Sequence, residues 1–179
     1  MPRLTPFSHV VLTLIGRGGA GAHDLVRMMR QGRLYWAGSP SHYYAEPRRL
    51  EQLGLLTSRV EPGRTGQRTH YELTDAGLAE LREWLATPTA FPRIQSEPIV
   101  RALAADLADA DTVLQGFDAL EAELDDVEAE LEALEQQAGS LPDRRAILMI
   151  NHRLGRRIVA AHREWLAEVR QELTQRRGR

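Results

Sequence analysis

Hydrogen-bonding and cationic side chains gather in one short stretch of the sequence, residues 39–56. A helix here would carry apolar residues three or four apart on one face, namely Tyr43, Pro47, Leu50 and Leu53. Its other faces would carry polar or charged groups, namely His42, Tyr44, Glu46, Arg48 and Arg49. Imidazole, hydroxyl and guanidinium groups contact base edges and phosphates in nucleic-acid complexes. The stretch therefore predicts a helix that packs with one face and binds nucleic acid with another.

The expected helix has start and stop signals at its ends. Ser39 or Ser41 can cap its N-terminus, and Gly54 can end it. Pro47 is unusual, because a proline inside a helix removes an amide donor and clashes with the preceding turn. We expect a kink there, which would change how the two following arginines reach a partner.

The same residue types form no recognisable catalytic or metal-binding motif. The chain has no cysteine, and none of its 6 histidines lies in an HExxH or comparable short spacing. It also lacks a nucleophile elbow. The glycine-rich run at residues 16–21 has neither the spacing nor the lysine of a phosphate-binding loop, so it is interpreted as a turn between helices. We expect a protein that is not an enzyme and that uses no metal or cofactor.

Two helices precede the stretch and a β-hairpin follows it. The first helix carries apolar residues on one face and ends at the glycine-rich run: Phe7, Val10, Val11, Leu14 and Ile15. A second helix is expected over residues 22–32. Residues 55–60 and 68–73 are typical of two strands joined by a glycine-bearing turn at 61–67, and Thr74 can cap another helix. This order predicts a mainly α fold with a small β-hairpin wing, a winged helix-turn-helix.

Several short motifs in the first half of the chain form one pattern. They are Ser-Pro-Ser at 39–41, Tyr44, Arg49-Leu50 followed by Gly54-Leu55, and Tyr71 with the segment 73–77. This pattern resembles the winged-helix domain of the PadR family of bacterial transcriptional regulators. The resemblance covers the first half closely and the second half loosely. It implies a homodimeric DNA-binding regulator, a repressor rather than an activator, that acts by occupying its operator.

The resemblance assigns roles to the polar residues of the stretch and the hairpin. The helix from Ser41 would enter the major groove, and the hairpin would approach the backbone or the minor groove. The predicted DNA-binding residues are Ser39, Ser41, His42, Tyr44, Arg48, Arg49, Arg64 and Arg68. Arg49 has an alternative role, an ion pair with an acid inside the domain.

Prolines mark a boundary in the middle of the chain. Pro88, Pro92 and Pro98 fall within eleven residues, and such a segment lets the helices that follow take their own direction. We predict a DNA-binding domain over residues 1–87, a linker over 88–98 and a helical dimerisation domain over 99–179.

A heptad seam follows the boundary and requires a partner helix. Its members are spaced by four and three residues: Val113, Phe117, Leu120, Leu124, Val127, Leu131 and Leu134. Residues 106–143 carry thirteen acids and no base, whereas residues 144–179 carry ten arginines and three acids. The acids either pair with the basic last helix or form only a solvated face. A paired arrangement is either a hairpin within one chain or an exchange between two chains.

The last helix, expected over about residues 143–175, has an apolar side of its own. That side comprises Ile147, Ile150, Leu154, Ile158, Ala161, Trp165, Val169 and Leu173. Similarity to PadR proteins with a long C-terminal half implies that these helices make a homodimer. The predicted dimerisation residues are the heptad seam together with Leu154, Ile158 and Trp165.

Aromatic residues near the expected boundary allow two interpretations. Tyr35, Trp36, Trp84, Phe91 and Trp165 either pack the domains together or surround an apolar pocket for a small-molecule effector.

A different class of function is a coiled-coil adaptor that does not bind DNA. A salt-dependent shift with duplex DNA would separate that adaptor from a regulator. The apolar run at residues 10–15 is far shorter than the roughly 20 residues of a membrane span, and no signal-peptide pattern surrounds it. We therefore expect a soluble cytoplasmic protein with no membrane partner.

Overall fold

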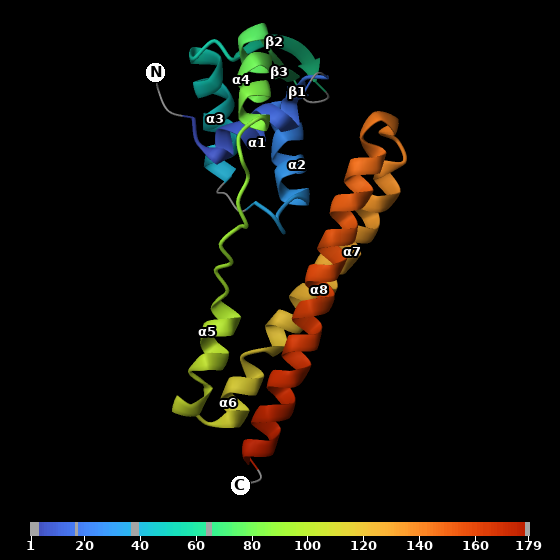
Figure 1. Cartoon of the computed structure of the whole chain (residues 1–179). Helices are drawn as coiled ribbons and strands as arrows, with labels where there is room; N and C mark the ends of the chain where they lie inside the picture. Colours follow the sequence, from blue (N-terminus) through green and yellow to red (C-terminus); the bar gives the residue numbers. More distant parts are fainter. Residues whose placement is uncertain (1–3, 17, 37–39, 64–65, 178–179) are drawn as a thin grey trace. The chain divides into compact units, whose positions relative to one another are not determined.

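The computed structural model of this 179-residue chain describes residues 4–16, 18–36, 40–63 and 66–177. The chain divides into two compact units, an N-terminal unit, Met1–Phe91, and a C-terminal unit, Pro92–Arg179. Figure 1 labels their helices and strands. The predicted fold class is confirmed, because a mainly helical chain carries one small antiparallel sheet. Among the described residues, no helix combines the length and apolarity needed to cross a membrane.

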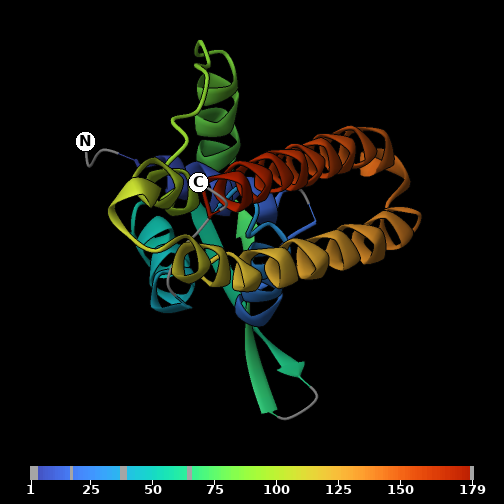
Figure 2. The same ribbon diagram turned by 90° about the horizontal axis from the view of Figure 1, so that it is seen from below.

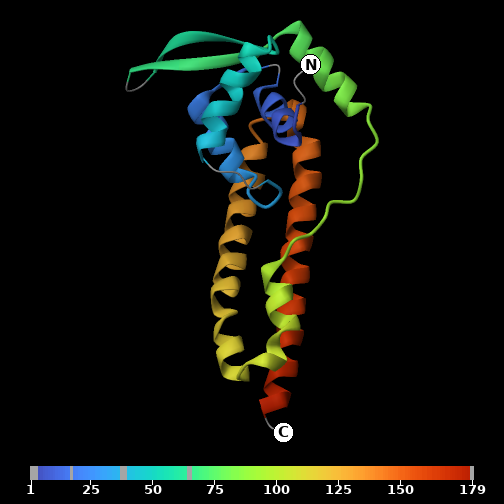
Figure 3. The ribbon, with the colours of Figure 1, turned by 90° about the vertical axis from the view of Figure 1, so that its left-hand side faces the viewer.

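The N-terminal unit combines helices with a three-stranded sheet of order β1-β3-β2. Its helices are α1 (Pro6–Ile15), α2 (Ala22–Gln31), α3 (Pro40–Gln52) and α4 (Asp75–Leu85). Its strands are β1 (Ala20–Gly21), β2 (Leu56–Gly63) and β3 (Gly66–Leu73). The β2–β3 hairpin extends away from the helices of this unit (Figure 3). The described arrangement is therefore a winged helix-turn-helix.

The core of this unit fixes the inner face of α3. Leu12 of α1, Leu25 of α2 and Leu50 of α3 are buried together with the sheet. Tyr43 and Pro47 are buried on the same side of α3 as Leu50, which confirms the predicted packing face. The helix is continuous across Pro47, and the kink expected from this residue stays a prediction.

The sheet includes a strand that the sequence did not indicate. The glycine-rich run, interpreted as a plain turn, contains β1, whose Ala20 and Gly21 pair with Tyr71 and His70 of β3. Gly19 has a positive φ of 70°, and a Cβ there would collide with the His70 imidazole. Only glycine can therefore bring this segment against β3.

The wing strands are longer than predicted. Pro62 pairs with Gln67 and Gly63 with Gly66, so most of the turn expected at 61–67 is strand. Pro62 is tolerated because β2 lies at the edge of the sheet, where a missing amide donor breaks no ladder on its open side.

Helix α4 begins as predicted. The Thr74 hydroxyl accepts a hydrogen bond from the Gly77 amide at 3.0 Å and donates one to the Gly54 carbonyl at 2.7 Å. Leu81 is buried. Leu85 is 72% exposed, so only part of the apolar side of this helix packs.

The C-terminal unit is helical throughout its described elements. They are α5 (Glu97–Leu103), a 3₁₀ turn (Ala105–Leu107), α6 (Ala110–Gln115), α7 (Asp118–Ala138) and α8 (Pro142–Arg177). Pro98 lies in the first turn of α5, where its missing amide costs no helical hydrogen bond. The heptad seam, expected as one run, is divided where α6 ends at Gln115 and α7 begins at Asp118.

Helices α7 and α8 lie side by side as an antiparallel hairpin (Figures 1 and 2). Leu124 and Leu131 of α7 are buried with Val159 of α8, and Phe117 is buried with Leu166. The heptad seam therefore finds its partner within the same chain, and its predicted role in dimerisation stays a prediction.

The inner face of α8 differs from the predicted apolar side. The buried residues of α8 are His152, Gly155, Val159, Leu166 and Leu173. Ile147, Ile150 and Leu154, which were expected to pack, are about half exposed at 56%, 51% and 50%. Aliphatic residues therefore remain at three of the buried positions, and His152 and Gly155 take these positions in the first half of the helix, where the larger aliphatic residues lie on another face.

An arginine ladder, defined as Arg156, Arg163 and Arg170, joins α8 to α7. Arg156 donates to Glu135 at 2.9 and 3.0 Å. Arg163 donates to Asp125 at 2.6 Å and Glu128 at 2.8 Å. Arg170 donates to Asp118 at 2.9 Å and Glu121 at 3.1 Å. The expected pairing of an acidic helix with a basic helix is confirmed.

Candidate nucleic-acid interface

The outer face of α3 carries the polar groups that the sequence singled out. Ser41, His42, Tyr44 and Arg48 are exposed, while the opposite face of the helix is buried. The Tyr44 hydroxyl lies 3.4 Å from Nδ1 of His23 in α2. His23 therefore borders this surface, and no sequence pattern indicated it because α2 and α3 meet only in the fold. Ser39 lies outside the described residues.

Arg49 faces inward and anchors α3. Its guanidinium donates to both carboxylate oxygens of Glu46, at 3.0 and 2.8 Å, and to the Ser8 hydroxyl of α1 at 3.0 Å. Partial burial alone would raise the pKa of Glu46, but the hydrogen bonds from Arg49 and Ser8 outweigh it and lower that pKa. This geometry matches the alternative role considered for Arg49, an ion pair inside the domain.

The wing brings arginines and acids together. Arg68 lies 3.1 Å from Glu61 and 3.8 Å from Asp24, and Arg59 lies 2.7 Å from Glu61. The hydrogen bond from Arg59 lowers the pKa of Glu61, although partial desolvation opposes this shift, and Arg68 adds to the lowering. Arg64, the other predicted wing contact, lies outside the described residues.

The aromatic residues predicted for an effector pocket belong to both units, and each is described in its own unit. Trp84 stacks on His9 with 4.8 Å between ring centroids and 9° between planes. Tyr35 and Trp36 are 42% and 40% exposed, and Phe91 is 86% exposed. In the C-terminal unit, Trp165 makes an edge-to-face contact with Phe117 at 5.9 Å. A pocket built from all five residues stays a prediction.

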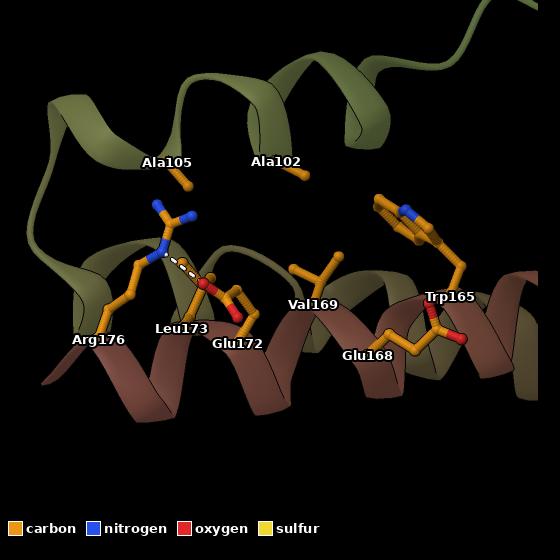
Figure 4. A pocket seen from close by; sticks show the side chains of 8 residues that line it. All are labelled: Ala102, Ala105, Trp165, Glu168, Val169, Glu172, Leu173 and Arg176. Carbon is orange, nitrogen blue, oxygen red and sulfur yellow. Dashed lines mark hydrogen bonds and ion pairs between the residues drawn. The ribbon is translucent and has the colours of Figure 1, made fainter. Parts of the chain in front are cut away.

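The C-terminal unit contains a small groove between α8 and the α5 region (Figure 4). Its floor is formed by Trp165, Val169 and Leu173, and the small side chains of Ala102 and Ala105 leave the space open. The groove measures about 240 Å³, below the range of about 300–1,000 Å³ usual for ligand sites. Glu168, Glu172 and Arg176 complete its lining. Within the described part of the chain, no group of three or more His, Asp or Glu residues is arranged to hold a metal ion.

Comparison with known proteins identifies the architecture. No family model and no curated protein sequence matches the chain. The structure of Bacillus subtilis PadR in complex with operator DNA is similar, with a TM-score of 0.72 and 20% identity over 93% of this chain and 99% of that one. The PadR-like regulator BC1756 from Bacillus cereus gives a TM-score of 0.76 and 20% identity over 94% and 98%. The Vibrio cholerae virulence activator AphA gives 0.72 and 24% over 94% and 98%. The two-unit chain thus has the fold of the PadR-like transcriptional regulators.

Proposed function

We propose that this protein is a homodimeric transcriptional regulator that binds duplex DNA and represses by occupying an operator. The observation that carries the proposal is the division of α3 into two faces. One face is held in the core by Tyr43 and Leu50, and the other exposes His42, Tyr44 and Arg48. Structural similarity to a PadR in complex with operator DNA supports a DNA-binding role for this fold here.

The mechanism follows from the dimensions of a helix and a groove. An α-helix with its side chains is about 10–12 Å across, and the major groove of B-DNA is about 12 Å wide. His42 and Tyr44 would then contact base edges, and Arg48 would contact a guanine edge or a phosphate. The wing, beside α3 in the chain, would place Arg68 against the backbone.

Dimerisation is proposed through the C-terminal unit. The α7–α8 hairpin buries the heptad seam internally, which leaves a separate outer aliphatic face on α8, defined as Ile147, Ile150 and Leu154. Ile158 continues this face and is partly buried. A two-fold dimer would present two α3 helices to half-sites about 34–36 Å apart.

The test of DNA binding begins with selection from random duplexes, followed by affinity measurements on the selected sequence. We expect Arg48→Ala to weaken binding and, if its contact is to a phosphate, to lower the slope of log affinity against log salt by about 0.9. Arg82→Ala is the matched control, because it removes the same charge from an exposed position on α4. Failure of the unaltered chain to bind any duplex at low salt would overturn the proposal and favour the adaptor.

A further inference from the structure

The described charges of the β2–β3 hairpin all lie on one face. Arg59 is opposite His70 and Glu61 is opposite Arg68 in the antiparallel register, and Glu72 is opposite Thr57. Residues directly opposite each other share a face, and alternate residues along a strand share it too. The other face carries uncharged residues, namely Ser58, Val60, Pro62, Gln67, Thr69 and Tyr71. Arg59 and Arg68 therefore share their face of the hairpin with acids.

Glu61 is at the centre of this charged face. Its Oε1 accepts a hydrogen bond from Arg59 Nε at 2.7 Å, and its Oε2 accepts one from Arg68 at 3.1 Å. Its side chain is only 21% exposed, so water competes for it less than for a fully exposed acid. Glu72 also pairs with Arg59, but no described contact joins Glu72 to Arg68. Glu61 is thus the described acid that bridges both arginines.

A carboxylate and a DNA phosphate compete for the same guanidinium groups. Charge-assisted hydrogen bonds from arginine to carboxylate or phosphate have similar geometry and are among the stronger hydrogen bonds in proteins. Sequence-independent affinity for DNA comes essentially from phosphate neutralisation. An acid that pairs with Arg59 and Arg68 therefore lowers the sequence-independent part of the affinity for DNA. The base contacts proposed for α3 are unaffected.

We propose that Glu61 is a specificity-determining residue, which holds Arg59 and Arg68 on the wing and limits their contact with DNA phosphates. The inference rests on the proposed DNA-binding function. Release of an arginine adds a phosphate contact on any duplex, and this contributes most where base contacts do not already fix the position of the wing.

The decisive variant is Glu61→Gln, which keeps the size of the side chain and removes its charge. One added phosphate contact steepens the salt slope by about 0.9, which is a gain of about eightfold at 0.1 M salt. We expect the variant to bind unrelated duplexes about eightfold more tightly at 0.1 M salt, with a steeper slope. We also expect a smaller ratio between its affinities for the selected and unrelated duplexes. The control Glu83→Gln removes the same charge from an exposed position of α4 and is expected to leave that ratio unchanged.

A triple variant separates released arginine from a general change in net charge. In Glu61→Gln with Arg59→Ala and Arg68→Ala, the gain is expected to be lost relative to Arg59→Ala with Arg68→Ala, because both arginines that would use the phosphate are gone. A gain of the same size in the triple variant would overturn the inference. Circular dichroism and thermal unfolding verify that each variant is folded. If Glu61→Gln fails to fold, Glu61→Asp replaces it, because it keeps the charge and shortens the reach to both arginines.

The outcomes also separate this inference from the function on which it rests. If the unaltered chain binds no duplex, the proposed function fails. If it binds in a manner that depends on Arg48, but Glu61→Gln leaves both slope and specificity ratio unchanged, only the role of Glu61 fails.

Discussion

At the scale of single residues, His9 connects two helices of the N-terminal unit. Its Nδ1 lies 3.1 Å from the Thr5 carbonyl, and its Nε2 lies 3.0 Å from the Glu80 carboxylate of α4. Its ring also stacks on Trp84. A mostly buried polar side chain with all these contacts stabilises the contact between α1 and α4.

We expect His9→Ala to lower the free energy of unfolding by about 1–3 kcal/mol, because it leaves polar partners unsatisfied and removes packing. His42→Ala makes the same substitution on the exposed face of α3, and its effect is expected to stay within about 0.5 kcal/mol. Urea denaturation of both variants measures the difference. A loss for His9→Ala as small as that expected for His42→Ala would show that the His9 contacts add no stability.

The polar residues of α3 show how much of the candidate site can be predicted from the sequence. The spacing of apolar residues predicted which face packs, so the exposure of His42 and Arg48 followed from it. The inward position of Arg49 depends on Ser8, which is 41 residues away and is brought close only by folding. The spacing of Glu46 and Arg49 allowed their ion pair without deciding between it and a contact with DNA.

At the scale of elements, the α7–α8 hairpin depends on ionised acids. The hydrogen bond from Arg156 lowers the pKa of Glu135, with partial desolvation opposing the shift. A carboxyl with a lowered pKa contributes stability at pH values above its ordinary pKa of about 4.3 and loses it as the pH falls through the lowered value.

We therefore expect Glu135→Gln to be less stable than the unaltered chain at neutral pH and to approach it in stability below about pH 4. Thermal unfolding followed by circular dichroism between pH 7 and pH 3 measures this convergence. Glu123→Gln on the exposed part of α7 is the control. A constant difference across this range would mean that the effect of Glu135 is not electrostatic.

Two elements show why parts of the fold could not be predicted from the sequence. Strand β1 has only two residues, which is too short for a period of alternation. In the first half of α8, the large aliphatic residues pointed to Ile150 and Leu154, whereas the buried positions are His152 and Gly155. Hydropathy favours the larger residues and gives no reason to bury a histidine or a glycine.

At the scale of the whole molecule, the proposed dimer depends on the outer aliphatic face of α8. We expect Ile150→Glu with Leu154→Glu to give monomers that keep their helical content, because both positions are about half exposed in the single chain. The control Ala160→Glu with Ala167→Glu adds the same charges at other exposed positions of α8.

Substitution of the internal seam should behave differently. Leu124→Glu with Leu131→Glu places carboxylates in the core of the hairpin and is expected to unfold it. Sedimentation velocity and circular dichroism distinguish the two pairs of variants. A folded dimer with Glu at 150 and 154 would exclude the outer aliphatic face of α8 as the dimer contact.

The arginine ladder repeats every seven residues along α8, and its acidic partners repeat along α7. A hairpin displaced by seven residues would bring most arginines opposite new acids, so the ladder does not distinguish these alignments, whereas the short connection at residues 139–141 permits one of them. The edge-to-face pair of Phe117 and Trp165 occurs at one level only and has no equivalent seven residues away. The short connection and this aromatic pair thus both favour one alignment, which charge pairing alone would not distinguish from its neighbours.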